Sequence, residues 1–349
     1  MTGSGPNLGR AVDWRFAGTV GARLARPGPP ATDYTRRQAI DELAGAARAA
    51  EAPVREVTQL ADDAPVDEAL IVDREQWIRS ASDSMRVMTG GAPTPSGRLA
   101  ARIAGAQTGA VLAFISSGIL GQYDPFASGR PDGQGALLLV YPNVIAVERQ
   151  LRLTPKDFRL WVCLHEVTHR VQFTANPWLA GHMSNALSVL TSERDDDVAH
   201  MLGGLADFVR KRSPGHSSEP GGIVGLLRAV QSEPQRAALD RLLVLGTLLE
   251  GHADYVMDAV GPAVVPSVHL IRSRFDERRH RKQPPLQRLL RALLGVDAKL
   301  SQYTRGRAFV DHVVDRVGMT RFNSVWSGPE TLPLPAEIEN PQRWIDRVL

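Results

Sequence analysis

The stretch His165-Glu166-Val167-Thr168-His169 decides how the rest of this chain of 349 residues is interpreted. Positions i and i+4 lie one turn apart on the same face of an α-helix, so both histidine rings can reach one metal ion. Glu166 lies one step round that helix, close enough to act as a general base on a metal-bound water without being a ligand. The stretch therefore predicts one half of a zinc site.

The flanking residues predict that this stretch lies in a helix of roughly 155–174. Thr154 is a capping residue, Pro155 suits the first helical position, and Asn176-Pro177 ends the segment. A broad stripe at helical spacing places the histidines beside apolar residues, and it contains Phe158, Trp161, Val162, His165, His169 and Gln172. The alternative is a buried helix whose histidines only make local hydrogen bonds. A zinc site requires a third protein ligand.

A candidate third ligand lies downstream in the sequence Leu-Glu-Gly-His-Ala-Asp, residues 249–254. Glu250 and Asp254 share the apolar face of a segment predicted to be helical from about Gln235 to Ala259. Because unpaired buried carboxylates are unfavourable, we predict that Glu250 binds the metal and that Asp254 accepts the spare N–H of a ligand histidine. The alternative is a solvated face with two ordinary acids. His252, about 200° round from Glu250, is expected to face away as a surface or second-layer residue.

These two motifs resemble those of the zincin-like metallopeptidase type 2 family, a group of hydrolases associated with biosynthesis of a deazaflavin cofactor. The resemblance extends from about residue 70 to the C-terminus, and it is also carried by residues 120–126, 140–143, 302–309 and 332–337. It implies a zincin-like fold, zinc held by His165, His169 and Glu250, and Glu166 as the base.

The composition is that of an ordinary globular chain. Hydrophobic residues make up 43% and charged residues 23%, and a net charge of +3 gives no electrostatic reason to expect a nucleic-acid partner. The single Cys163 cannot form an internal disulfide and fits a reducing cytoplasm. The apolar run from Gly109 to Leu120 is too short to span a membrane, and Met1 to Asp33 lacks the apolar core of a signal peptide. We therefore expect a cytoplasmic protein with no membrane partner.

The hydrophobic periodicity predicts a predominantly helical α+β fold with a small β-sheet beside the helix that carries the two histidines. Residues 1–33 are expected to form an extended arm and residues 34–349 a single domain. Further helices are predicted at about 34–60, 66–90, 96–120, 184–212 and 285–318. Ala136–Tyr141 is the clearest strand. The family resemblance suggests that it lines the cleft and pairs with a substrate, whereas its residues alone indicate only a buried strand.

Three further features are candidates for the site. Residues 213–222 have the composition of an exposed loop and are a candidate lid, with an inert surface loop as the alternative. The arginine-dense run from Arg272 to Lys282 is either a solvated face with ion pairs or a binding surface for an acidic substrate. Tyr303, Arg307 and His312 are candidates to stabilise an oxyanion, with a packing role as the alternative for the tyrosine.

The sequence as a whole predicts a zinc-dependent peptide or amide hydrolase. Zinc lowers the pKa of a bound water, and Glu166 takes a proton from that water and passes it to the leaving amine. Two other classes stay open: an inactive zincin-like binding or scaffold protein, and a non-proteolytic hydrolase of cofactor metabolism. The sequence contains no cysteine-rich segment to supply a fourth protein ligand, as a structural zinc site would need, which favours a catalytic site. An open groove would suit peptides, and a deep pocket would suit the cofactor-related hydrolase.

Overall fold

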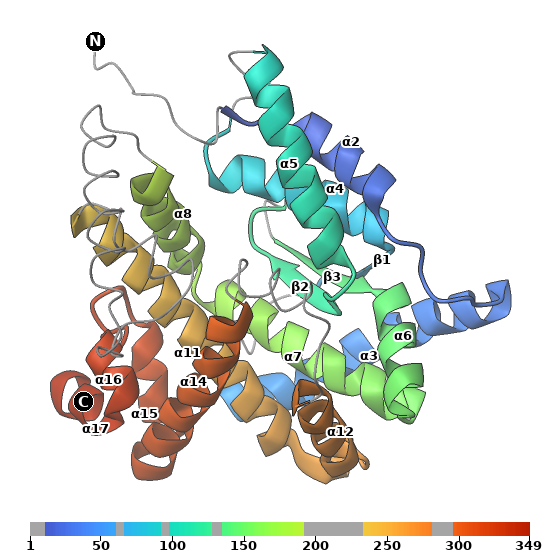
Figure 1. Ribbon diagram of the computed structural model, residues 1–349. Coiled ribbons are helices and arrows are strands. Elements are labelled where there is room, and N and C mark those ends of the chain that lie inside the picture. The colour runs from blue at the N-terminus through green and yellow to red at the C-terminus, as the bar shows by residue number, and fades with distance from the viewer. Residues whose placement is uncertain (1–10, 61–65, 92–97, 128–134, 192–232, 281–295) are drawn as a thin grey trace, which may run out of the picture.

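The computed structural model describes residues 11–60, 66–91, 98–127, 135–191, 233–280 and 296–349. Helices dominate this part of the chain, and one small sheet lies among them (Figure 1), which confirms the predicted helical α+β fold. The helices are α2 (Trp14–Leu24), α3 (Asp33–Thr58), α4 (Arg74–Met88), α5 (Arg98–Ser116), α6 (Tyr141–Leu151), α7 (Pro155–Ala175), α8 (Trp178–Thr191), α11 (Glu233–Val264), α12 (Val268–His280), α14 (Val296–Val317), α15 (Met319–Phe322), the 3₁₀ turn η1 (Asn323–Trp326), α16 (Pro335–Glu339) and α17 (Pro341–Val348). The strands are β1 (Leu70–Val72), β2 (Gly121–Asp124) and β3 (Ala136–Val140).

The strand predicted from the apolar run lies in the middle of the sheet. The order is β1-β3-β2, with β1 parallel and β2 antiparallel to β3. Every residue of β3 is buried: Leu137 and Leu139 face the core around α7, and the alternate residues face α4 and α5. The buried strand is confirmed, but its suggested pairing with a substrate is wrong, because strands already occupy both of its edges. The helix predicted from residue 66 begins only at Arg74, since the preceding residues form β1.

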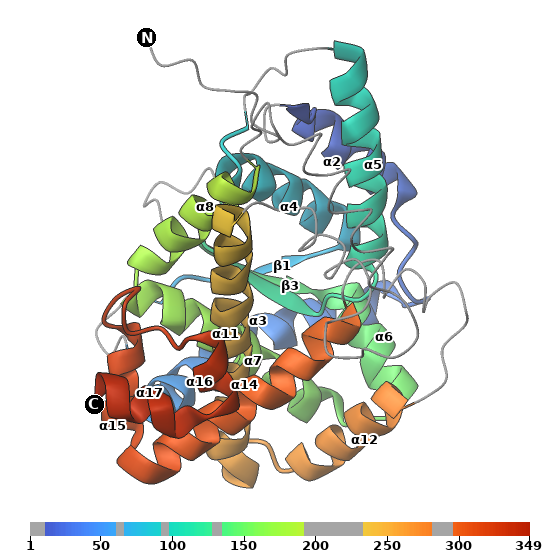
Figure 2. The ribbon, with the colours of Figure 1, turned by 60° about the vertical axis from the view of Figure 1, so that its left-hand side comes forward.

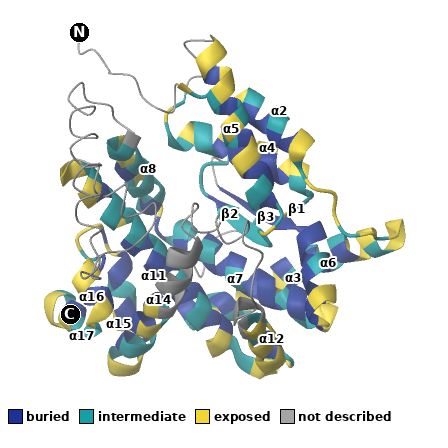
Figure 3. Ribbon diagram, in the orientation of Figure 1, coloured by how far each residue is buried: buried dark blue, intermediate teal, exposed yellow. Residues whose placement is uncertain are grey.

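Helix α7 lies between the sheet on one side and α3, α11 and α12 on the other (Figures 1 and 2). It begins and ends almost as predicted, and Figure 3 shows that buried residues predominate along it. Two buried arginines tie it to its neighbours. Arg159 pairs with Glu148 of α6, at 2.9 Å, and with Glu42 of α3, while Arg170 pairs with Glu51 of α3. These pairs hold the backbone of α7 in place.

Helices α11 and α14 cross at two glycines (Figure 2). A Cβ atom built on Gly251 would lie only 2.2 Å from the carbonyl carbon of Gly306, so only glycine allows this approach. The crossing is next to Glu250 and packs α14 directly on the helix that carries it. The helical geometry of α11 breaks at Gly261, with φ of 69°, two residues beyond the end predicted at about Ala259.

The prediction of an extended N-terminal arm is wrong for residues 14–24, which form α2. Asp13 caps this helix by accepting a hydrogen bond from the backbone N–H of Phe16, at 2.9 Å. A Cβ on Gly21 would lie 2.8 Å from the carbonyl oxygen of Gly109 in α5. The glycines therefore form a helix–helix contact instead of part of an extended arm. Residues 25–32 have no regular secondary structure, as expected.

Within the described residues, α5 contains a segment long and apolar enough to cross a membrane, Leu99–Ser116, with a mean hydropathy of 1.3. Core helices of globular proteins have similar length and composition. Leu112 and Ala113 of α5 are buried with α4 and β3. Only 33% of that segment is buried, and Leu99, Ile103 and Val111 are exposed, so burial in a core accounts for only part of its apolar surface.

Candidate metal centre

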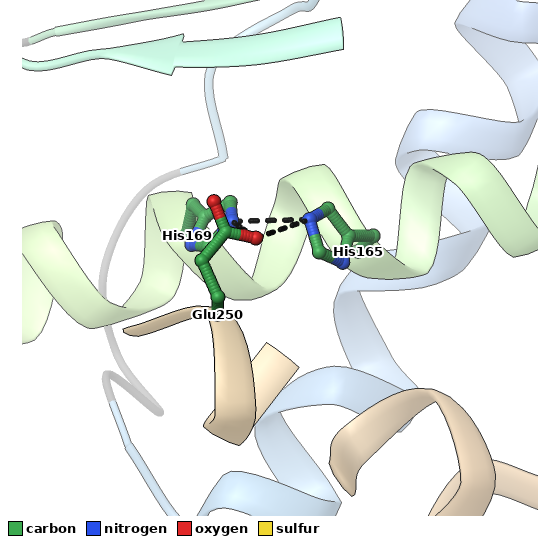
Figure 4. Close-up of side chains that lie close together, drawn as sticks. All are labelled: His165, His169 and Glu250. Carbon is green, nitrogen blue, oxygen red and sulfur yellow. Dashed lines mark hydrogen bonds and ion pairs between the residues drawn. The ribbon is translucent and has the colours of Figure 1, made fainter. Parts of the chain in front are cut away.

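The three predicted metal ligands converge from two helices (Figure 4). His165 and His169 point from α7 toward Glu250 of α11, and one potential ligand atom from each lies within 4.8 Å of the other two. The Nε2 atoms of the histidines are 3.2 Å apart, and Glu250 Oε2 lies 3.4 Å from His165 Nε2 and 3.9 Å from His169 Nε2. Their side chains retain 14–20% of their accessible surface, although the ligand oxygen Glu250 Oε2 is itself buried.

The electrostatics of this cluster favour a cation. Burial acts to lower the pKa of His165, but hydrogen bonding to Glu250 and the negative charge of nearby carboxylates outweigh it, and the pKa is raised. Two imidazole nitrogens and one carboxylate oxygen are also the donor set found in hydrolytic zinc sites. The residues therefore fit a bound zinc ion.

Glu166 is buried beside the ligands, against the edge strand β2. A Cβ on Gly121 would lie 2.6 Å from Glu166 Cγ and 2.9 Å from its carboxyl carbon, so the missing side chain of Gly121 makes the space that the glutamate fills.

The hydrogen bonds between β2 and β3 show which backbone groups of β2 face outward. The backbone N–H of Val140 donates to Leu120 O, at 2.8 Å. Because antiparallel strands alternate, Gly121 and Tyr123 turn their backbone groups away from β3. Among the described residues, β3 is the only strand paired with β2, so the outer edge of β2 has no strand beside it.

A buried glutamine contacts one of the ligands, which the sequence prediction missed. Gln172 Oε1 lies 2.9 Å from His169 Nδ1, and Gln172 Nε2 lies 3.1 Å from Leu249 O and 3.0 Å from His252 Nδ1. Its spacing of three residues from His169, on the same stripe, was the available signal. His252 lies in the second layer: it is fully buried, and burial, followed by the charge of His169, lowers its pKa to about 3.

Asp254 does not take the position predicted for it on a ligand imidazole. Its carboxylate pairs instead with the guanidinium of Arg272 in α12, which also binds Asp258 at 2.9 Å. A cation from a neighbouring helix satisfies the carboxylate more strongly than a neutral imidazole N–H would. Arg274 pairs with Glu277 at 3.2 Å, so these two arginines of the dense run form ion pairs.

The other predicted site residues are not brought to the metal ligands by any described contact. Arg307 is held by Asp258 and Asp311, at 2.7 Å each, and it also donates to the carbonyl oxygen of Asp254, at 2.8 Å. The side chain of Tyr303 lies outside the described residues, as does the candidate lid at residues 213–222. Arg307 therefore belongs to an ion-pair network that joins α11 and α14.

The comparisons with known proteins concern the family and the fold of the chain. One similar solved structure, from Chloroflexus aurantiacus, is described as "a putative hydrolase with a novel fold"; it shares 28% identity with this chain and a TM-score of 0.67, and the match covers 96% of this chain and 98% of that one. No curated protein matches the chain significantly. Residues 12–345 match the family described as zincin-like metallopeptidases, and together with the solved structure this match supports a hydrolase. The chain belongs to the zincin-like metallopeptidase family.

Proposed function

We propose that this protein is a zinc-dependent metallopeptidase that cleaves a peptide or a small amide. The observation that carries the proposal is the convergence of His165, His169 and Glu250 beside the buried carboxylate of Glu166. When bound, zinc would lower the pKa of water and polarise the carbonyl of the substrate. The incomplete burial of the three side chains supports access by a substrate.

The residues of the chain have separate roles in this proposal. Glu166 takes a proton from the attacking water and passes it to the nitrogen of the leaving group. Its burial against Gly121 limits the conformations of the Glu166 side chain, so less conformational entropy is lost when the carboxylate reaches the reactive geometry. The outward backbone groups of Gly121 and Tyr123 can bind an extended peptide as an additional strand.

The free, buried thiol of Cys163 is consistent with a cytoplasmic location, which we also propose.

The first experiment is the metal content of the purified, unchelated protein, with Glu250→Ala in parallel. We expect about one zinc ion per chain in the wild type and a large loss in the variant. Zinc retained in the variant would assign the third ligand to another residue. Wild-type protein that stays free of zinc after reconstitution would favour a binding or scaffold protein.

The second experiment tests the base with a peptide library and a set of small amides. Glu166→Gln should keep zinc and lose hydrolysis, because the amide cannot accept the proton. Glu75→Gln is a matched control, since Glu75 is exposed on α4, where it pairs with Arg79. Full hydrolysis by zinc-loaded Glu166→Gln would exclude the mechanism. Cleavage of small amides alone would favour the cofactor-related hydrolase.

A further inference from the structure

We infer that Gln172 is a positioning residue that holds His169 in the one tautomer able to bind a metal through Nε2. The inference rests on the metal site of the proposed function and is independent of the substrate. Gln172 is fully buried on α7, and each polar atom of its side-chain amide has a partner. Its orientation can therefore be deduced from the chemistry of those partners.

The carbonyl of Leu249 determines which way the amide points. A backbone carbonyl can only accept a hydrogen bond, so the group 3.1 Å from it must be the NH₂ of Gln172. A flipped amide would place two oxygens against each other. The Oε1 atom therefore faces His169, on the opposite side of the amide.

This orientation sets the protonation of His169. Because Oε1 can only accept, the Nδ1 atom 2.9 Å away must carry the proton. The neutral ring then has its lone pair on Nε2, the atom that lies 3.2 Å from His165 Nε2 and 3.9 Å from Glu250. A ligand histidine that binds a metal through Nε2 needs this tautomer.

His252 supports the same orientation from the other side. The second hydrogen of the amide NH₂ points to His252 Nδ1, at 3.0 Å, so this ring accepts at Nδ1 and carries its proton on Nε2. The ring is packed against Phe322 and Trp326, at centroid distances of 5.4 and 5.5 Å, and its Nε2 has no hydrogen-bond partner within the described part of the chain. Burying that N–H is unfavourable, and the hydrogen bond from Gln172 offsets the cost of a histidine here.

Two substitutions separate positioning from packing. Gln172→Met keeps the length of the side chain but removes the acceptor for His169. Gln172→Glu keeps an acceptor, and a carboxylate needs no anchor to orient it, because both of its oxygens accept. It loses both hydrogen bonds donated by the amide and places a carboxylate oxygen against Leu249 O, so its metal-free form should be less stable than the wild type. Gln122→Met is the control: that glutamine binds Trp77 Nε1 at 3.0 Å on the other face of the sheet.

The measurements are zinc affinity by chelator competition, the absorption spectrum of the cobalt-loaded protein, and thermal unfolding of the metal-free protein. We expect Gln172→Met to weaken zinc binding about 10–100-fold and to change the cobalt spectrum. Gln172→Glu should bind zinc within a few-fold of the wild type even where its metal-free form unfolds earlier, and Gln122→Met should bind as the wild type does. Wild-type affinity in Gln172→Met would overturn the inference. The inference would also be overturned if Gln172→Met and Gln172→Glu lost the same zinc affinity and this loss matched the loss of thermal stability in their metal-free forms.

A measurement on the wild type keeps the test decisive if a variant does not fold. Long-range proton–nitrogen NMR of the metal-free protein, with labelled histidine, reports which ring nitrogen carries the proton. We expect the proton on Nδ1 of His169 and on Nε2 of His252. The opposite tautomer on either ring would overturn the inference. A wild type that binds neither zinc nor cobalt would refute the proposed function itself, whereas tight binding in both the wild type and Gln172→Met would refute this inference alone.

Discussion

The crossing of α11 and α14 predicts opposite effects for the same substitution at two glycines of one helix. Gly251→Ala places a Cβ atom 2.2 Å from the carbonyl carbon of Gly306, 2.5 Å from its oxygen and 2.6 Å from the backbone nitrogen of Arg307. Gly246→Ala, in the same helix, places its Cβ where, apart from the adjacent residues and backbone of α11, no atom of the described residues lies within 4 Å. The two variants gain the same helix propensity and differ in the contact they create.

The magnitude follows from these distances. Non-bonded carbon atoms prefer roughly 3.5–4.0 Å, so the helices would have to separate by more than about 1 Å. Overpacking costs about 1–3 kcal/mol, and the upper end applies here because backbone atoms cannot rotate away. Alanine gains about 1 kcal/mol over glycine within a helix. The net expectation is a loss of about 2 kcal/mol for Gly251→Ala and a gain of about 1 kcal/mol for Gly246→Ala.

Urea denaturation followed by circular dichroism gives both free energies of unfolding. The expected separation of about 3 kcal/mol corresponds to about 6 °C between the two thermal midpoints, at about 2 °C per kcal/mol for a chain of this size. Gly251→Ala should also weaken zinc binding, because Glu250 is the adjacent residue. Equal stability of the two variants would refute the close crossing as the reason for glycine at 251.

Three further predictions concern charged groups and the metal. Arg159→Met leaves Glu148 buried without its cation, so the free energy of unfolding should fall by about 3 kcal/mol in urea denaturation; an unchanged midpoint would speak against the buried pair. Burial acts to raise the pKa of Glu337, but hydrogen bonds from Arg347 and from a backbone N–H outweigh it, and the pKa is lowered. The charged form of Glu337 therefore stabilises the folded protein at pH values above the ordinary carboxyl pKa. This stability is lost as the pH falls through the lowered pKa. Glu337→Gln should therefore lose about 2 kcal/mol at pH 7 and unfold like the wild type in acid below that pKa, and a loss that is the same at both pH values would contradict this linkage. Removing zinc with a chelator should lower stability by about 2.7 kcal/mol relative to zinc at about 100 times its dissociation constant, and Glu250→Ala should show no such zinc-dependent shift in its thermal midpoint.

The elements that the sequence predicts best are those whose ends carry strong local signals. Helix α7 has a proline at its first position and an Asn-Pro pair after its end, and it begins and ends within one residue of the prediction. The break at Gly261 and the buried strand β3 also follow from local residues. Helix α2 was missed because its glycines look like loop residues, and their partner Gly109 lies far along the chain. Strand β1 has three residues, too few for a period to be detected.

The same division applies to the candidate site. The spacing of the motif and the apolar neighbours of Glu250 were sufficient to select the three side chains that the structure brings together. The partners of these side chains were not predictable. Asp254 lies four residues from Glu250, but which group neutralises it depends on how α12 packs, and that packing brings Arg272 into reach. The contact between Gln172 and Leu249 likewise depends on the distance between two helices that are remote in sequence.

The absence of a side chain at Gly121 has a consequence for sorting relatives of this protein. An alanine at this position would place its methyl group within 2.9 Å of two carbon atoms of Glu166, so the glutamate and a larger residue at 121 cannot both occupy the places seen here. A homologue that keeps the histidines and the glutamate but carries a bulkier residue at the position of Gly121 must hold its glutamate elsewhere. Inspection of that one position in a set of genomes would therefore sort relatives, before any protein is purified, by whether their glutamate can occupy the position of Glu166 seen here.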